Sequence, residues 1–290
     1  MGRFNGSAWS TAAPIAFLVL WSSGFVFLKV GLTYSDPLTF LALRYACVIG
    51  LLAIAGLWIR PSATLSAAGW LNLAIVGLFL QAGYFSFTYL SLKYGLSAGA
   101  VALITSQQPI LVGLFAPMVA AENVGPRRWT GLLLGVAGAA IVVLSKASVE
   151  IASPLGLSFA VLALISMACG TLWEKRFGIT VHPITSNFVQ CAVGLGVVAP
   201  LALALEPMHV EWTLGLISSL AYLVLGNSIL AISLLLAMIR RGEASRVSAL
   251  FFLVPPMTAI TAFVVLGETV PVFAMLGICM AAAGIFLVMT

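Results

Sequence analysis

The chain has 290 residues, of which 62% are hydrophobic and 7% are charged, and its mean hydropathy is +1.17. A water-soluble domain carries about 25% charged residues to cover its surface, so this composition excludes a soluble protein and predicts an integral membrane protein. The net charge of +5 comes from cations scattered over short loops, which argues against a basic nucleic-acid-binding domain.

Apolar stretches long enough to cross a bilayer follow one another along the whole chain. A spanning helix needs about 20 apolar residues, and charges, prolines and polar clusters divide the chain into about ten such stretches. The predicted fold class is therefore an all-α membrane protein with about ten transmembrane helices. We expect the helices at residues 11–30, 37–59, 68–91, 95–120, 127–145, 154–174, 184–205, 211–237, 243–266 and 270–289.

The chain also contains a repeat of half its length. Gly95, Pro109 and Glu122 recur as Gly242, Pro256 and Glu268, at a shift of 147 and then 146 residues, and Gln81 falls on Asn227. The first copy covers residues 1–147 and the second covers 148–290, with five helices each. Because five is odd, the second copy enters the membrane upside down, and such inverted repeats are typical of secondary transporters.

The distribution of cations predicts the orientation in the bilayer. With the N-terminus in the cytoplasm, nine Lys and Arg residues lie on the cytoplasmic side and four on or toward the other. The positive-inside rule then places both termini in the cytoplasm of a bacterial-type inner membrane.

Several ordered motifs resemble one family. They are Trp21-Ser22-Ser23-Gly24-Phe25 with Lys29, then Asp36-Pro37 followed by Arg44, and then Pro109, Glu122 and Gly131 with their copies Pro256, Glu268 and Gly277. The chain resembles the drug/metabolite transporter superfamily in its ten-helix EamA-type branch. The resemblance implies export or exchange of a small metabolite through a central cavity walled by helices one to four and six to nine.

Polar and aromatic side chains at mid-depth are the candidates for binding the substrate. A polar helix face cannot point to lipid, where each unpaired polar group costs several kcal/mol, so it points inward. For any one residue, cavity lining and hydrogen bonding between helices are equal alternatives, and Trp173 also fits an aromatic belt at the interface. The candidates are Trp21, Tyr84, Thr105, Gln108, Trp173, Asn187, Ser248 and Phe252.

This lining suits a solute with a flat apolar part and a zwitterionic head. Among members of the resembled superfamily, exporters of neutral amino acids, including the aromatic (YddG-type) branch, fit it better than phosphate-sugar exchangers do. Nucleosides, sugars or drugs are alternative substrates, and a channel is an alternative mechanism. A membrane-embedded lipid enzyme needs acidic or histidine clusters at one interface, and these are missing.

Two prolines predict helix breaks. Pro109 removes a donor and frees the carbonyl of Thr105, so it can interrupt its helix near the midplane where transporters bind substrate. Pro256 is the matching residue of the ninth helix.

The cations within or near the spans have alternative interpretations. Lys29 and Lys175 are either a matched pair of gate charges or side chains that snorkel to the headgroups, and snorkelling is favoured. Arg44 can also snorkel; if it faces inward, it either binds a substrate carboxylate or pairs with Asp36.

Acidic residues are absent from the middle of every span, although coupled carriers usually place ionisable groups along the pathway. We therefore expect facilitated diffusion of a net-neutral solute by alternating access. No nucleotide-binding loop or nucleophile–base pair is present, and the four cysteines lack CxxC spacing, so we expect no enzyme activity, cofactor or metal.

Two stripes of small residues complete the pattern. Gly131, Gly135 and Gly138 share one helix face, as do Gly277, Ala281 and Gly284. Such stripes allow close helix packing, either within the subunit, which is favoured, or in a homodimer.

Overall fold

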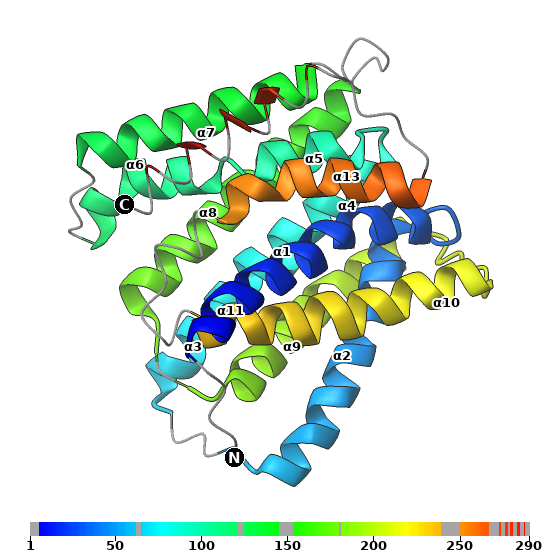
Figure 1. Cartoon of the computed structure of the whole chain (residues 1–290). Helices are drawn as coiled ribbons and strands as arrows, with labels where there is room; N and C mark the ends of the chain where they lie inside the picture. The colour runs from blue at the N-terminus through cyan, green and yellow to red at the C-terminus, as the bar shows by residue number, and fades with distance from the viewer. Residues whose placement is uncertain are drawn as a thin grey trace.

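The structure is a computed structural model in which the helices pack into one bundle (Figure 1). It describes residues 6–61, 65–120, 125–144, 153–179, 181–238 and 250–266, and beyond these the single positions 273, 276, 277, 279, 280, 283, 284 and 287. Within these residues the fold is all-α, with one isolated antiparallel bridge between Ser35 and Val210. The predicted all-α class is confirmed.

The observed helices follow the predicted spans as far as residue 266. The first half contains α1 (Gly6–Gly31), α2 (Pro37–Ile59), α3 (Ala67–Gly77), η1 (Leu78–Phe85), α4 (Ser86–Lys93), α5 (Ala98–Thr105), α6 (Gln108–Ala120) and α7 (Pro126–Leu144). The second half contains α8 (Pro154–Phe177), α9 (Pro183–Leu205), α10 (Leu214–Ala221), η2 (Tyr222–Ala231), α11 (Ile232–Met238), η4 (Phe251–Leu253) and α13 (Val254–Leu266). The predicted span 270–289 lies largely outside the described residues.

Seven helices of the described chain are long and apolar enough to cross a membrane. Two shorter apolar helices, Trp129–Gly138 and Val254–Val265, add to them. Several side chains that face outward from the bundle are large and apolar, among them Trp58 and Leu57, which are 86% and 75% exposed. A bilayer covers such residues, so their exposure agrees with a membrane protein.

Local signals explain where the helices begin. Proline occupies the first turn of α2, α8 and α9, where its missing N–H costs nothing and its fixed φ suits a helix. The side chain of Ser153 accepts a hydrogen bond from the backbone N–H of Gly156, and Ser66 does the same for Gly69. These are N-caps, which satisfy donors that a helix start leaves free.

The helix contacts repeat between the two halves. The first helix, α1, packs against α13 and η2, and in Figure 1 it lies between the orange α13 and the yellow α10 with its continuation. Helix α8 packs in the same way against α6 and η1. Two further contacts, α2 with α9 and α5 with α13, join helices at matching positions of the two halves.

Several of the described helices are irregular at mid-length. The third and eighth spans each contain a π-helical segment, η1 and η2, at corresponding positions of the two halves. The fourth span is interrupted by a turn at Ser106 and Gln107, directly before Pro109. In the ninth span, the 3₁₀ turn η4 precedes the α-helix that contains Pro256. Such irregular segments often mark functional positions within helices.

The small-residue stripes pack against each other inside the chain. A Cβ built on Gly284 would lie 2.6 Å from both the carbonyl oxygen of Gly131 and the backbone nitrogen of Gly135. Gly138 and Gly277 are also buried, and Ala281 lies outside the described residues. The described glycines of the two stripes therefore pack against each other within one subunit, which is the arrangement that the first alternative expects.

Candidate functional site

A pocket lies where helices from both halves meet. It is small and partly open, with a cavity volume of about 20 Å³, which is room for about one water molecule. Its residues are Trp21, Gly24, Phe25 and Leu28 of α1, Arg44 of α2, Tyr84 and Phe85 of η1, Thr88 of α4, and Leu223 and Asn227 of η2. The four residues of α1 are spaced along a single helix face, as a lining surface requires.

Arg44 is the charged group of this pocket. It is 2% exposed and donates three hydrogen bonds, from Nε to Ser228 Oγ (2.9 Å), from one terminal nitrogen to the Tyr89 hydroxyl (3.2 Å), and from the other to Asn227 Oδ1 (2.7 Å). Its guanidinium carbon also lies 4.5 Å from the ring centroid of Phe85. All of these partners are neutral, so within the described residues the positive charge is solvated by dipoles and an aromatic face but is not compensated.

The neighbours of Arg44 are themselves held in place. Asn187 Nδ2 donates a 3.0 Å hydrogen bond to the backbone carbonyl of Ser228, which ties α9 to the π-helical segment η2. A Cβ built on Gly24 would lie 2.7 Å from Asn227 Nδ2. The glycine of α1 thus allows the close approach that places the Asn227 amide beside Arg44.

The rest of the pocket is mostly apolar and aromatic. Trp21, Phe25, Leu28, Phe85 and Leu223 form its walls. Behind Trp21, the ring of Phe251 lies edge-on at a centroid distance of 5.6 Å, which links α1 to the ninth span. This lining suits a solute with an apolar part.

Two polar hydroxyls face the same space. Tyr84 is 3% exposed and lies on the pocket wall. Thr88 is 2% exposed, and its hydroxyl interacts with that of Tyr84. Because it also lines the pocket, Thr88 is a candidate contact for a ligand.

Three of the predicted substrate residues differ clearly in their positions. Trp21 and Tyr84 line the pocket. Trp173 does not: it lies near the end of α8, where its Nε1 donates a 3.3 Å hydrogen bond to Asn72 Oδ1 and its ring contacts Phe177.

The other predicted residues lie outside the pocket lining or outside the described chain. Asn187 is buried and supports η2 through the carbonyl of Ser228. Thr105 and Gln108 are both 4% exposed and flank the interruption between α5 and α6. Ser248 and the side chain of Phe252 fall outside the described residues.

The predicted gate charges are also apart from the pocket. Lys29 lies in the last turn of α1 and Lys175 in the last turn of α8, and neither is among the lining residues. The alternative partner suggested for Arg44, Asp36, instead lies 3.9 Å from Lys93 Nζ and accepts a 2.9 Å hydrogen bond from the backbone of His209. The pairing of Arg44 with Asp36 is therefore not formed.

Sequence analysis alone missed most of the partners of Arg44. Tyr89, Asn227 and Ser228 were not predicted as site residues, although Asn227 matches Gln81 in the repeat. That match is the one signal that singles out Asn227, since nothing local in η2 shows that it faces α2.

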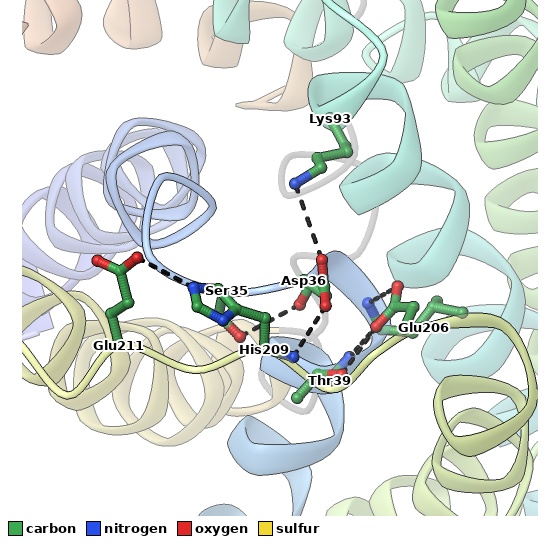
Figure 2. Close-up of polar contacts among 8 residues, drawn as sticks. Ser35, Asp36, Thr39, Lys93, Glu206, His209 and Glu211 are labelled. Atoms are coloured by element: carbon green, nitrogen blue, oxygen red, sulfur yellow. Dashed lines mark hydrogen bonds and ion pairs between the residues drawn. The ribbon is translucent and has the colours of Figure 1, made fainter.

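Polar contacts join the start of α2 to the end of α9 and the loop that follows it (Figure 2). Glu206, at the C-terminal end of α9, accepts 2.8 Å hydrogen bonds from the backbone nitrogens of Leu38 and Thr39 and from the Thr39 hydroxyl. Asp36 and His209 join the two loops through the backbone bond from Asp36 N to His209 O (3.2 Å) and through the Asp36 carboxylate. We call these contacts the Glu206 clasp, because they fasten the start of α2 to the loop that follows α9.

No cluster of three or more His, Cys, Asp or Glu side chains among the described residues is arranged to hold a metal ion.

A helical membrane bundle with a buried pocket between helices of both halves is the architecture of a secondary transporter.

The chain belongs to the EamA-like transporter family, whose sequence pattern matches residues 9–144 and 154–290. This confirms the resemblance to the drug/metabolite transporter superfamily, and the chain is a multi-pass membrane transporter rather than an enzyme.

Relatives agree with this assignment. The chain is 27% identical over 282 residues to an uncharacterized transporter, YvbV, of Bacillus subtilis, covering 97% of this chain and 92% of the relative. It is 26% identical over 283 residues to a "Probable amino-acid metabolite efflux pump" of Salmonella typhimurium, covering 93% and 91%. A solved crystal structure at 18% identity superposes with a TM-score of 0.76 over 96% of this chain and 95% of the other, which supports the fold.

Proposed function

We propose that the protein exports small neutral metabolites, and amino acids in particular, by alternating access. The observation that carries this proposal is the pocket itself: Trp21, Arg44 and Tyr84 from the first half meet Leu223 and Asn227 from the second around one buried space. A site between two halves that move relative to each other can open to either side in turn. The Salmonella relative named as an amino-acid metabolite efflux pump supports the substrate class.

The matching helix contacts support two inverted halves, residues 1–147 and 148–290. The contacts of α1 with α13 and η2 have their counterparts in those of α8 with α6 and η1, and the contact of α2 with α9 joins two helices at the same position in each half. A two-fold axis generates this pattern. With an odd number of helices in each half, this axis lies in the membrane plane. In the predicted orientation, both termini lie on the cytoplasmic side of the inner membrane.

The Glu206 clasp supports a conformation that is closed on one side. By the predicted orientation, the start of α2 and the loop after α9 lie on the outer face. Export requires the pocket to open to that face, so the hydrogen bonds of the Glu206 clasp must break in each transport cycle.

The composition of the pocket supports uncoupled transport. None of its described lining residues is Asp or Glu, so these residues offer no carboxylate to carry a proton or bind sodium. The solute then moves down its own gradient.

Uptake by purified protein in liposomes tests the proposal. We expect saturable uptake of apolar amino acids, accelerated when the same amino acid is loaded on the opposite side, because a carrier returns faster with substrate bound. Rates that neither saturate nor show this trans-stimulation would indicate a channel, and proton movement in fixed proportion to substrate would refute uncoupled transport. Uptake restricted to nucleosides or sugars would refute the amino-acid assignment.

A further inference from the structure

We propose that Arg44 binds the carboxylate of the transported solute and that the pocket recognises this carboxylate far more strongly than the amino group. The proposal rests on the proposed transport function and names the chemical feature that its site selects. It follows from three independent observations in the described residues: a buried charge without a counter-charge, donors left over on that charge, and an otherwise apolar pocket.

The charge of Arg44 is left for a ligand to compensate. Burying an ion is expensive unless it is paired, and a cation within a membrane bundle usually faces an anion or a watery cavity. The three hydrogen-bond partners of Arg44 are the hydroxyls of Ser228 and Tyr89 and the amide oxygen of Asn227, all of them neutral. A substrate anion would supply the missing counter-charge.

The guanidinium also has free hydrogen-bonding capacity. Arginine carries five N–H donors, and three of them are used by the described protein residues. Two donors remain on a group that lines the pocket. A carboxylate, with two oxygens, is the small group that matches a guanidinium in both charge and geometry.

The amino group of a zwitterion finds no matching charge among the described lining residues. The pocket offers hydroxyls at Thr88 and Tyr84 but no acidic side chain. The Thr88 hydroxyl can accept one hydrogen bond from an ammonium group or a hydroxyl, but it carries no negative charge. Removing the amino group from the ligand should therefore reduce its binding affinity little, whereas neutralising its carboxylate should reduce the affinity strongly.

The competing interpretation is that Arg44 only joins α2 to α4 and η2. A purely structural arginine would affect all ligands equally when replaced. If Arg44 binds the carboxylate, replacing it should instead change the preference of the protein for an acid over its amide. The ratio of the two affinities therefore distinguishes the two interpretations, whereas the affinity for a single ligand does not.

Isothermal titration calorimetry on the purified full-length protein tests the proposal with three probes: L-phenylalanine, 3-phenylpropanoate and phenylalaninamide. For the wild type we expect the first two to bind within a few-fold of each other. Because hydrogen bonds to charged groups contribute about 1.5–3 kcal/mol, the amide should bind at least about tenfold more weakly. Equal binding of the amide and the amino acid would overturn the proposal without any variant.

Variants then assign the preference to one residue. In Arg44→Gln the preference for the two acids over the amide should disappear, and in Arg44→Lys it should be partly retained. The matched control is Arg60→Gln, since Arg60 is an exposed arginine at the end of the same helix. An unchanged preference in Arg44→Gln would overturn the role of Arg44.

The proposed function can fail separately. If 3-phenylpropanoate binds through Arg44 but no amino acid is transported, the amino-acid assignment is wrong and the carboxylate site stands. If the protein binds and transports only solutes that lack a carboxylate, the carboxylate site and the amino-acid assignment are both wrong.

Discussion

Glu206 allows the closure of one face of the transporter to be tested directly. Its carboxylate accepts hydrogen bonds from two backbone amides in the first turn of α2, those of Leu38 and Thr39, and from the Thr39 hydroxyl. Replacing it by alanine removes all three hydrogen bonds and a negative charge beside a helix N-terminus. We expect the Glu206 clasp to open more often in Glu206→Ala than in the wild type.

The magnitude follows from the two interactions that Glu206 makes with the start of α2. Removing a capping side chain from a helix N-terminus costs about 0.5–2 kcal/mol. Removing a negative charge from that position costs a further 0.3–1 kcal/mol or so. The sum, about 1–3 kcal/mol, corresponds to a rise of roughly five- to 140-fold in the population of the open form, since 1.4 kcal/mol is a factor of ten.

Hydrogen–deuterium exchange of the peptide that contains Leu38 and Thr39 measures this opening. We expect exchange of these amides to be at least about fivefold faster in Glu206→Ala, because local opening exposes the donors that Glu206 protects. Glu206→Gln keeps an acceptor oxygen but removes the charge, so its effect should be intermediate.

Glu211→Gln is the matched control, because Glu211 is an exposed carboxylate in the same loop that contacts the ring of His209. Protection of the α2 amides should be unchanged in this control. If Glu206→Ala leaves their exchange at the wild-type rate, the Glu206 clasp does not hold the face closed, and the reasoning fails.

Two glycines give further predictions with a common control. Gly24→Ala places a Cβ 2.7 Å from Asn227 Nδ2, so it should displace the amide that holds Arg44. Because a small misplacement at a binding site is costly, liposome uptake should fall by roughly tenfold. Uptake at the wild-type rate would contradict this prediction. Gly77→Ala places a Cβ 2.9 Å from the backbone Cα of Gln190, which cannot rotate away as a side chain could. Helices α3 and α9 must therefore separate, and the free energy of unfolding should fall by about 1–3 kcal/mol. Thermal unfolding in detergent measures that decrease, and an unchanged melting temperature would show that the helices adapt. In Gly50→Ala the new methyl group has nothing within 4 Å, so both uptake and melting temperature should stay at the wild-type values.

The helices of this protein could be predicted because their signals are local. Length and hydropathy locate each span, and prolines such as Pro37 and Pro154 sit at helix starts, where their geometry fits. The inward direction of the face that carries Tyr84 and Thr88 also follows from sequence, since polar groups avoid lipid.

The depth of a side chain in the membrane and the residues that it contacts could not be predicted in the same way. Trp21 and Trp173 both look like cavity aromatics by residue type, yet the first lines the pocket and the second bonds to Asn72 near the end of α8. Helical periodicity gives the direction of a side chain around the axis, but which neighbour it meets depends on how the helices cross.

Length, hydropathy and residue spacing were enough to predict the class of protein, the helices up to residue 266, the half-length repeat and the interruption near Pro109. The contacts of Arg44 with Asn227 and Ser228, more than 180 residues away, and not with Asp36, could be found only from the packing of the helices. The same holds for Glu206 at the start of α2 and for Gly284 against Gly131. The physical reason is that hydropathy and backbone preference act over one or two helical turns, whereas a buried charge takes its partners from whichever helices pack around it.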